Sequence, residues 1–262
     1  MLKEIRIPYE DYEIPLTIVM PDDSEGPYPC VLMLHGFLSG RNRDGRLLAR
    51  IGDVLQQSGI ASARMDFCSC GDSTGPRLKY GMRQMRGEIS CILQKLREDP
   101  CFQRDRIGIL GHSLGGRAAL SCCDLQPAFL ISLNGALGSR KKLALQLADR
   151  SGCLKSGRTT VHTSDGREEL LYPVFFQDLE QSPEPSADAF HGPLLICFGG
   201  QDPTVDPEVS RKFHARCRCH GKQLLCIDGA NHTFQAKTGD GSMVKEAAEE
   251  ICRWLQSIYM HE

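Results

Sequence analysis

The chain has 262 residues, of which 41% are hydrophobic and 24% charged, and its formal net charge at pH 7 is −2. This length suits one large domain, or a domain with a sizeable insertion, and the composition is ordinary for a soluble globular protein. The small net charge gives no reason to expect nucleic acid or an acidic membrane surface as a partner, and the apolar runs are shorter than the roughly 18 residues that span a bilayer.

The N-terminal residues predict an antiparallel pair of strands at the edge of a sheet. The two runs are 2–8 and 13–19, joined by a short connection at 9–12. The first run alternates and contains Glu4, unlike the continuous apolar segment of a signal peptide. We therefore expect a cytoplasmic protein.

The next part of the chain alternates between strand-like and helix-like segments. Residues 30–34 form a continuous apolar run, which is typical of a strand buried on both faces of a parallel sheet. The later segments of this part are predicted as helix 47–58, strand 60–65, helix 81–97, strand 106–110 and strand 128–133. Repeated strand-then-helix units predict an α/β protein with a doubly wound, mostly parallel sheet.

The alternation breaks after Asn134 and resumes near Ala187. Residues 135–186 are too many for an ordinary connection and too few to build a large core of their own. We expect residues 1–134 and 187–262 to form one core domain, with 135–186 as an inserted lid. The resumed core is predicted to contain strand 193–198, helix 208–217, strand 223–227 and helix 243–258.

The predicted lid contains a hairpin signal. Two β-prone runs, 159–163 and 168–172, flank the dipeptide Asp165-Gly166. Asp-Gly between such runs is typical of a tight hairpin turn. A basic helical piece at 140–150 precedes the hairpin.

Residues 111–115, Gly-His-Ser-Leu-Gly, are the most informative motif of the chain. This G-x-S-x-G pentapeptide lies between a predicted strand and residues 116–121, which are typical of a helix start. Strand, tight turn and helix form the context of a nucleophile elbow, where a serine hydroxyl projects beside the N–H groups of a helix N-terminus. Ser113 is therefore the predicted nucleophile.

A serine hydroxyl needs a base to take its proton, and that base needs an acid to orient it. His232 follows the predicted strand 223–227, and Asp202 follows the predicted strand 193–198. In a doubly wound sheet these loops gather at the same edge. The chain order Ser113, Asp202, His232 then predicts a catalytic triad.

Two backbone groups complete the predicted site. The N–H groups of Leu114 and Phe37 are the candidate oxyanion donors, and Phe37 lies in the loop after strand 30–34.

Asp206 is a second candidate for the acid of the triad. Asp202 is favoured, because it lies nearer to the end of strand 193–198.

The thirteen cysteines are scattered along the chain, and many lie in or beside apolar runs. Two C-x-C pairs, Cys68/Cys70 and Cys217/Cys219, give a weak metal signal. We expect structural thiols in a reducing compartment, and no metal or cofactor.

These motifs resemble the α/β-hydrolase superfamily over nearly the whole chain. The motifs in register are His35-Gly36-Phe37, Asp66 with Gly71-Asp72-Ser73, the elbow at 111–116, Gly200-Gln201-Asp202 and Asn231-His232. Size, lid position and the His-Gly-Phe loop resemble more narrowly the small bacterial cinnamoyl/feruloyl esterases. One departure is Cys70-Gly71-Asp72, where that family often has Gly-His-Gly.

The resemblance implies an α/β-hydrolase fold and a serine carboxylic-ester hydrolase that forms an acyl-enzyme on Ser113. The expected binding partner of the protein is a small ester substrate. A homodimer is one oligomeric state that the resemblance leaves open. In that family polar lid groups hold the acyl group, so Asp165, Tyr172 and Gln177 are candidate substrate-binding residues, together with His35.

Two alternatives stay open on the sequence. One is a prolyl-oligopeptidase-like peptidase or acyl-aminoacyl hydrolase, and the other is a non-catalytic binding protein on a hydrolase scaffold. A dienelactone hydrolase is disfavoured, because its nucleophile is cysteine and position 113 is serine.

Overall fold

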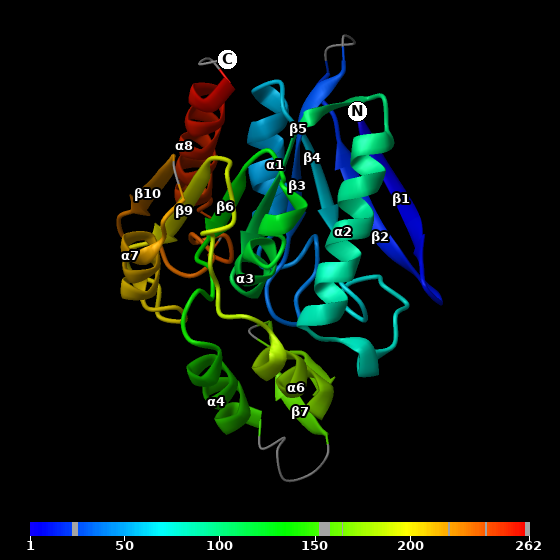
Figure 1. Ribbon diagram of the computed structural model, residues 1–262, viewed down its shortest axis with the longest axis vertical. Helices are drawn as coiled ribbons and strands as arrows, with labels where there is room; N and C mark the ends of the chain where they lie inside the picture. The colour runs from blue at the N-terminus through cyan, green and yellow to red at the C-terminus, as the bar shows by residue number, and fades with distance from the viewer. Residues whose placement is uncertain (23–25, 152–157, 164, 220, 239, 260–262) are drawn as a thin grey trace.

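One large sheet organises the protein. In the computed structural model the sheet strands are β1 (Leu2–Tyr9), β2 (Tyr12–Val19), β3 (Tyr28–Leu34), β4 (Ala61–Met65), β5 (Phe102–His112), β6 (Leu130–Leu133), β9 (Leu194–Gly199) and β10 (Lys222–Ile227). These eight strands pair in the order β1-β2-β4-β3-β5-β6-β9-β10 (Figure 1). The structure describes residues 1–22, 26–151, 158–163, 165–219, 221–238 and 240–259.

The sheet is antiparallel only at its N-terminal edge. Strand β1 pairs antiparallel with β2, and β2 pairs antiparallel with β4. Every other neighbouring pair is parallel. The predicted edge hairpin and the predicted mostly parallel, doubly wound sheet are therefore confirmed.

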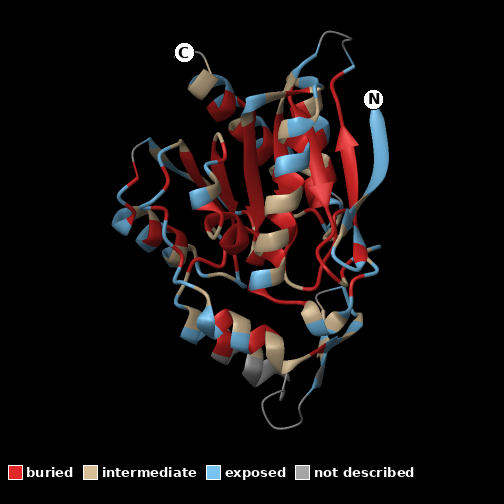
Figure 2. Cartoon of the chain, turned by 45° about the vertical axis from the view of Figure 1, so that its right-hand side comes forward, coloured by how far each residue is buried: buried red, intermediate tan, exposed pale blue. Residues whose placement is uncertain are grey.

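Helices cover both faces of the sheet, which is why its central strands are buried on both sides, whereas the edge strand β1 is mostly exposed (Figure 2). Helices α1 (Leu47–Gln57) and α8 (Ser242–Tyr259) pack on one face, and α2 (Met82–Glu98), α3 (Leu114–Leu120) and α7 (Pro207–Arg216) contribute to the cluster on the other. Side chains of a strand point alternately to its two faces, so Val31 and Met33 join the first cluster and Leu32 joins the second.

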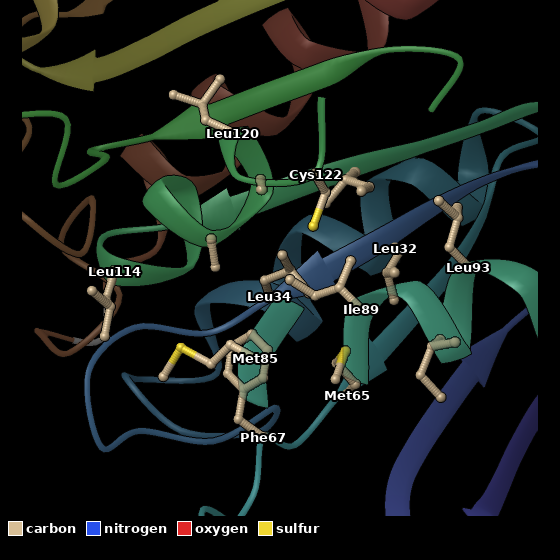
Figure 3. Packing of buried hydrophobic residues seen from close by; sticks show 14 of the residues in the cluster. Leu32, Leu34, Met65, Phe67, Met85, Ile89, Leu93, Leu114, Leu120 and Cys122 are labelled. Atoms are coloured by element: carbon tan, nitrogen blue, oxygen red, sulfur yellow. The ribbon is translucent and has the colours of Figure 1, made fainter. Parts of the chain in front are cut away.

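Helix α2 shows how the sequence pattern produces this packing. Its apolar residues recur at helical spacing, and Met85, Ile89 and Leu93 are buried against the sheet. Figure 3 shows these side chains in one cluster with Leu32 of β3. The helix predicted at 81–97 is confirmed, and its apolar stripe packs in the core.

The buried face of α2 also contains a carboxylic acid, Glu88, which the apolar pattern of the sequence did not reveal. Glu88 is fully buried, and its Oε1 accepts hydrogen bonds from the Tyr12 hydroxyl and from the Cys68 N–H, both at 2.7 Å. Burial raises the pKa of the Glu88 carboxyl to about 8. The carboxyl is therefore mostly protonated at neutral pH and joins the N-terminal hairpin to the loop after β4.

Between β6 and β9, the described parts of residues 135–186 form a separate group of elements at one end of the sheet (Figure 1). They contain α4 (Arg140–Ser151), an antiparallel hairpin of β7 (Thr159–His162) and β8 (Glu168–Leu171), and α6 (Pro173–Gln181). Helix α6 was not predicted. Its proline suits a helical first turn, and Phe175, Phe176 and Leu179 lie on its buried side.

A buried arginine joins this inserted segment to the core by hydrogen bonds and an ion pair. Arg117 of α3 is buried, and its guanidinium donates to the carbonyls of Ala136 at 3.1 Å and Gly138 at 2.9 Å. The same guanidinium lies 3.6 Å from the carboxylate of Glu184. One core side chain therefore contacts both the beginning and the end of the insertion.

The cysteines that the structure describes are free thiols, most of them buried, whereas Cys153 lies outside the described residues. Within the described ranges, no group of three or more His, Cys, Asp or Glu side chains is arranged to hold a metal ion. Helices in the same ranges fall short of the length and apolar character that crossing a bilayer requires.

Candidate active site

Ser113 occupies a sharp turn between β5 and α3. Its backbone has φ 56° and ψ −118°, a conformation that L-residues rarely adopt and that persists only where the surroundings enforce it. The turn is tight enough to require glycine two residues later. A Cβ at position 115 would lie 2.5 Å from the Leu34 carbonyl oxygen and 2.6 Å from that of His35.

The structure brings Ser113, His232 and Asp202 into one chain of hydrogen bonds. Ser113 Oγ lies 3.0 Å from His232 Nε2, and His232 Nδ1 lies 2.7 Å from Asp202 Oδ2. The carboxylate is fixed from behind, because Asp202 Oδ1 accepts the N–H groups of Thr204 at 2.8 Å and Val205 at 3.0 Å. Each of the three side chains follows the end of a different parallel strand.

This geometry is suited to proton transfer. With the Nδ1 proton donated to Asp202, the bare Nε2 of His232 accepts the Ser113 hydroxyl proton. Asp206, the rival acid, has a different partner. Its Oδ1 accepts the Glu208 N–H at 2.9 Å and caps α7, and the carboxylate next to His232 is that of Asp202.

His112 of the elbow holds the loop that carries His232. Its Nε2 lies 2.8 Å from the His232 carbonyl oxygen. Because that oxygen can only accept, the Nε2–H of His112 donates. Burial, and after it the adjacent His232 ring, lower the pKa of His112 to about 4. His112 is therefore neutral at pH 7 and adds no positive charge beside His232.

The loop that follows β3 lies against the elbow. A Cβ at Gly36 would sit 3.2 Å from the Cβ of Ser113, so the backbone of Phe37 runs close to the serine. The Leu38 N–H donates to the Tyr80 hydroxyl at 2.9 Å, and the Phe37 ring packs on Tyr80 and on Phe175 of α6. Phe37 and Leu114, the predicted oxyanion donors, both border the same cavity as Ser113.

That cavity has a volume of about 690 Å³, which is within the size range of small-molecule sites. Ser113 and His232 lie at its surface, and the inserted segment forms part of its wall. The apolar side chains that line it include Phe37, Leu114, Leu143, Leu147, Val161, Val205 and Val209. Its charged and titratable side chains include Asp44, Lys142, His162, Asp206 and Lys237.

The four residues expected to contact substrate are not among the described residues that line this cavity. His35 is buried, donating from Nδ1 to the Gly36 carbonyl at 2.8 Å and accepting the Phe67 N–H at Nε2 (3.1 Å). Asp165 forms ion pairs with Arg43 and Arg167, while Tyr172 precedes α6 and Gln177 is exposed on it.

The structure therefore places these four side chains away from the cavity surface beside Ser113, and their contact with substrate stays a prediction. His35 has a structural reason for its position, because burial lowers its pKa and its ring joins the loop after β3 to the loop after β4. Asp165 is held by the two arginines of the hairpin region and of the loop before α1.

Solved structures share this architecture over almost the whole chain. Est1E from Butyrivibrio proteoclasticus, in a structure with bound ferulic acid, is 19% identical with a TM-score of 0.79, covering 98% of this chain and 99% of that one. GrgF from Penicillium sp. sh18, an alpha/beta hydrolase, is 16% identical with a TM-score of 0.77 and the same coverage. The chain has the α/β-hydrolase fold. The fold implied by the sequence resemblance is confirmed.

Sequence comparisons find relatives that cover smaller parts of the chain. No family model matches it. It is 24% identical over 248 residues to an uncharacterised 31.7 kDa protein of Escherichia coli, covering 80% of this chain and 85% of that protein. It is 28% identical over 128 residues to 2,6-dihydropseudooxynicotine hydrolase of Paenarthrobacter nicotinovorans, covering 47% of this chain and 32% of that enzyme.

Proposed function

We propose that this protein is a serine carboxylic-ester hydrolase of the cinnamoyl or feruloyl type, working through an acyl-enzyme on Ser113. The observation that carries the proposal is the hydrogen-bonded chain from Ser113 through His232 to Asp202, which opens into a cavity of small-molecule size. A binding protein on the same scaffold would have no need to keep a base at 3.0 Å from a half-buried serine hydroxyl that borders a cavity.

In the first half of the reaction, His232 Nε2 takes the proton of Ser113 as Oγ attacks the ester carbonyl carbon. The negative charge that develops on the carbonyl oxygen is stabilised by the N–H groups of Phe37 and Leu114. The tetrahedral intermediate then expels the alcohol, whose oxygen receives the proton from His232. The acyl group stays on Ser113.

In the second half, His232 takes a proton from a water molecule, and the hydroxide attacks the acyl carbon. The second tetrahedral intermediate collapses, the Ser113 oxygen recovers its proton from His232, and the acid leaves. Asp202 remains ionised throughout, and it stabilises the imidazolium that forms twice in each turnover.

The cavity supports an acyl group with a sizeable apolar body. Its wall carries aliphatic side chains from α4 and α7 together with Phe37 of the core. Such walls favour an aromatic or branched acyl group over a short polar one. The structural similarity to Est1E, which binds ferulic acid, favours a hydroxycinnamoyl group within that class.

A panel of substrates tests the proposal: methyl ferulate, p-nitrophenyl esters and aminoacyl anilides. We expect hydrolysis of the esters, and loss of that hydrolysis in the Ser113→Ala variant. The Ser121→Ala variant is a matched control, because its hydroxyl donates to the Ala118 carbonyl at the end of α3 and contacts no triad residue. Faster cleavage of the anilides than of the esters would favour the peptidase alternative.

A further inference from the structure

A side chain outside the triad contacts the loops that carry two of its members. Asn134 follows β6 and is 1% exposed. Its Oδ1 accepts the N–H of Gly199, the last residue of β9, at 2.7 Å. Its Nδ2 donates to the carbonyl oxygens of His232 at 2.9 Å and Asn231 at 3.2 Å.

Both N–H groups of the Asn134 side-chain amide donate a hydrogen bond. The two Nδ2 protons have two acceptors, and both acceptors are backbone oxygens of the loop that carries His232. The acceptor side holds the end of β9, three residues before Asp202. The two loops whose side chains must meet at 2.7 Å are therefore joined by one planar, buried group.

The backbone around Asn134 is joined to the third member as well. The Leu133 carbonyl accepts the Ser113 N–H at 3.0 Å, and the Ala136 N–H donates to the Ser113 carbonyl at 2.9 Å. The turn that contains Asn134 thus contacts both the backbone N–H and the backbone carbonyl of the nucleophile. The Asn134 backbone itself has φ 47°, in the left-handed region, which asparagine tolerates better than most residues.

We propose that Asn134 is a positioning residue that sets the distances among Ser113, His232 and Asp202 by fixing the His232 loop against the end of β9. This inference rests on the proposed function, since a triad that does no chemistry needs no such precision. His112 donates to the same His232 carbonyl, so loss of the Asn134 amide leaves that oxygen one donor. The His232 ring then has more freedom relative to both partners.

The Asn134→Gly variant removes the amide and keeps the backbone conformation accessible, because glycine adopts positive φ without strain. We expect kcat to fall by about ten- to a hundred-fold with KM changed less than about threefold, because the catalytic geometry and not the cavity wall is altered. Ser132→Ala is the matched control. Ser132 is buried on β6, two residues before Asn134, and its hydroxyl has no hydrogen-bond partner among the described residues, so kcat should stay near that of the wild type.

A spectroscopic measurement separates positioning from a merely structural role and needs no substrate. The His232 Nδ1 proton, held between His232 and Asp202, should give a low-field ¹H NMR resonance that His232→Ala abolishes. In Asn134→Gly this resonance should broaden or move upfield, while Ser132→Ala should leave it in place. Both variants are measured below their unfolding temperatures.

Asn134→Asp provides a second variant in case the glycine variant does not fold. It keeps the shape and the acceptor for Gly199, but an ionised carboxylate cannot donate to the His232 and Asn231 carbonyls. As in the glycine variant, kcat should fall and the low-field resonance should broaden or move upfield.

Wild-type kcat and an unmoved resonance in either folded variant would overturn the inference, and so would a raised KM at unchanged kcat. Absence of ester hydrolysis by the wild type would count instead against the proposed function, and the resonance would still test Asn134.

Discussion

Asp202 Oδ2 and His232 Nδ1 lie 2.7 Å apart, although thirty positions of sequence separate the two residues. They meet because β9 and β10 are parallel neighbours, so the loops that follow these strands leave the sheet at the same edge. The other carboxylate oxygen of Asp202 is occupied by two backbone N–H groups. Only one oxygen is thus free to orient the imidazole.

This arrangement predicts a large effect of Asp202→Asn on activity. The amide keeps the bonds to the backbone N–H groups, but presents an NH2 group to His232 and favours the tautomer with its proton on Nε2. Steady-state kinetics on the preferred ester should show kcat reduced by roughly a thousand-fold or more. Asp206→Asn keeps an oxygen that accepts the Glu208 N–H and caps α7, since asparagine caps helices about as well as aspartate, so it should leave stability nearly unchanged and kcat within a few-fold. The reverse ranking of the two variants would assign the acid to Asp206.

The elbow predicts a steric effect of Gly115→Ala on stability. The added methyl group would lie 2.5 Å from the Leu34 carbonyl oxygen, so β3 or α3 must shift. We expect chemical denaturation to show a loss of roughly 2 kcal/mol or more, or failure to fold. At Gly138 the same methyl group would meet its nearest neighbour, Val209, at 3.8 Å. Gly138→Ala should therefore stay within about 0.5 kcal/mol of the wild type. Equal losses in the two variants would contradict the described turn.

Glu88 predicts a pH dependence of stability. The folded protein keeps the carboxyl proton up to a pKa of about 8, whereas the unfolded chain loses it near the ordinary value of 4.5. Between these values the folded state binds more protons, so this group lowers the free energy of unfolding as the pH rises, by about 1.4 kcal/mol per unit. Glu88→Gln should lack this fall while keeping an acceptor for Tyr12 and Cys68.

Urea denaturation at pH 5.5 and pH 8 measures the effect. The stability of Glu88→Gln relative to the wild type should improve by roughly 3 kcal/mol between these values. Glu246→Gln, at an exposed position of α8, should show no comparable change. A constant difference between Glu88→Gln and the wild type across the range would show that the carboxyl is ionised in the folded state.

We predict that the buried guanidinium of Arg117 stabilises the packing of the inserted segment on the core. Arg117→Met removes the bonds to the Ala136 and Gly138 carbonyls and leaves Glu184 without its buried partner. Thermolysin should then cleave within residues 135–186 at least several-fold faster than in the wild type, because local opening of this segment becomes more frequent. The exposed Lys141→Met, on α4, is the control and should change cleavage little. Equal cleavage of Arg117→Met and the wild type would contradict this role.

Local patterns made the core of the fold predictable. The strand and helix positions followed from continuous apolar runs, as in β3, and from period-3.6 apolar spacing, as in α2. The elbow follows from glycine and serine in a five-residue motif. Triad candidates were predictable because the fold dictates which strand each loop follows. Helix α6 escaped because its nine residues carry too short an apolar pattern to be distinguished from a loop.

Residues whose role depends on distant partners were not predictable in this way. Glu88 has the spacing of the buried stripe of α2, but a polar residue at that position indicates exposure. The hydroxyl that donates to its carboxyl belongs to Tyr12, 76 positions away. Asn134 lies at the end of an ordinary strand, and its partners Gly199 and His232 are distant in the chain. The ion pair between Asp165 and Arg43 was hidden for the same reason, since the two residues are distant in the chain.

Labelling with a fluorophosphonate probe tests the central claim most directly, because the probe reacts only with a serine whose proton a neighbouring base removes. The account predicts a single adduct on the peptide that contains Ser113, a parallel loss of ester hydrolysis, and no adduct in Ser113→Ala. An unlabelled Ser113 in a folded protein, or ester hydrolysis that persists in Ser113→Ala, would contradict it.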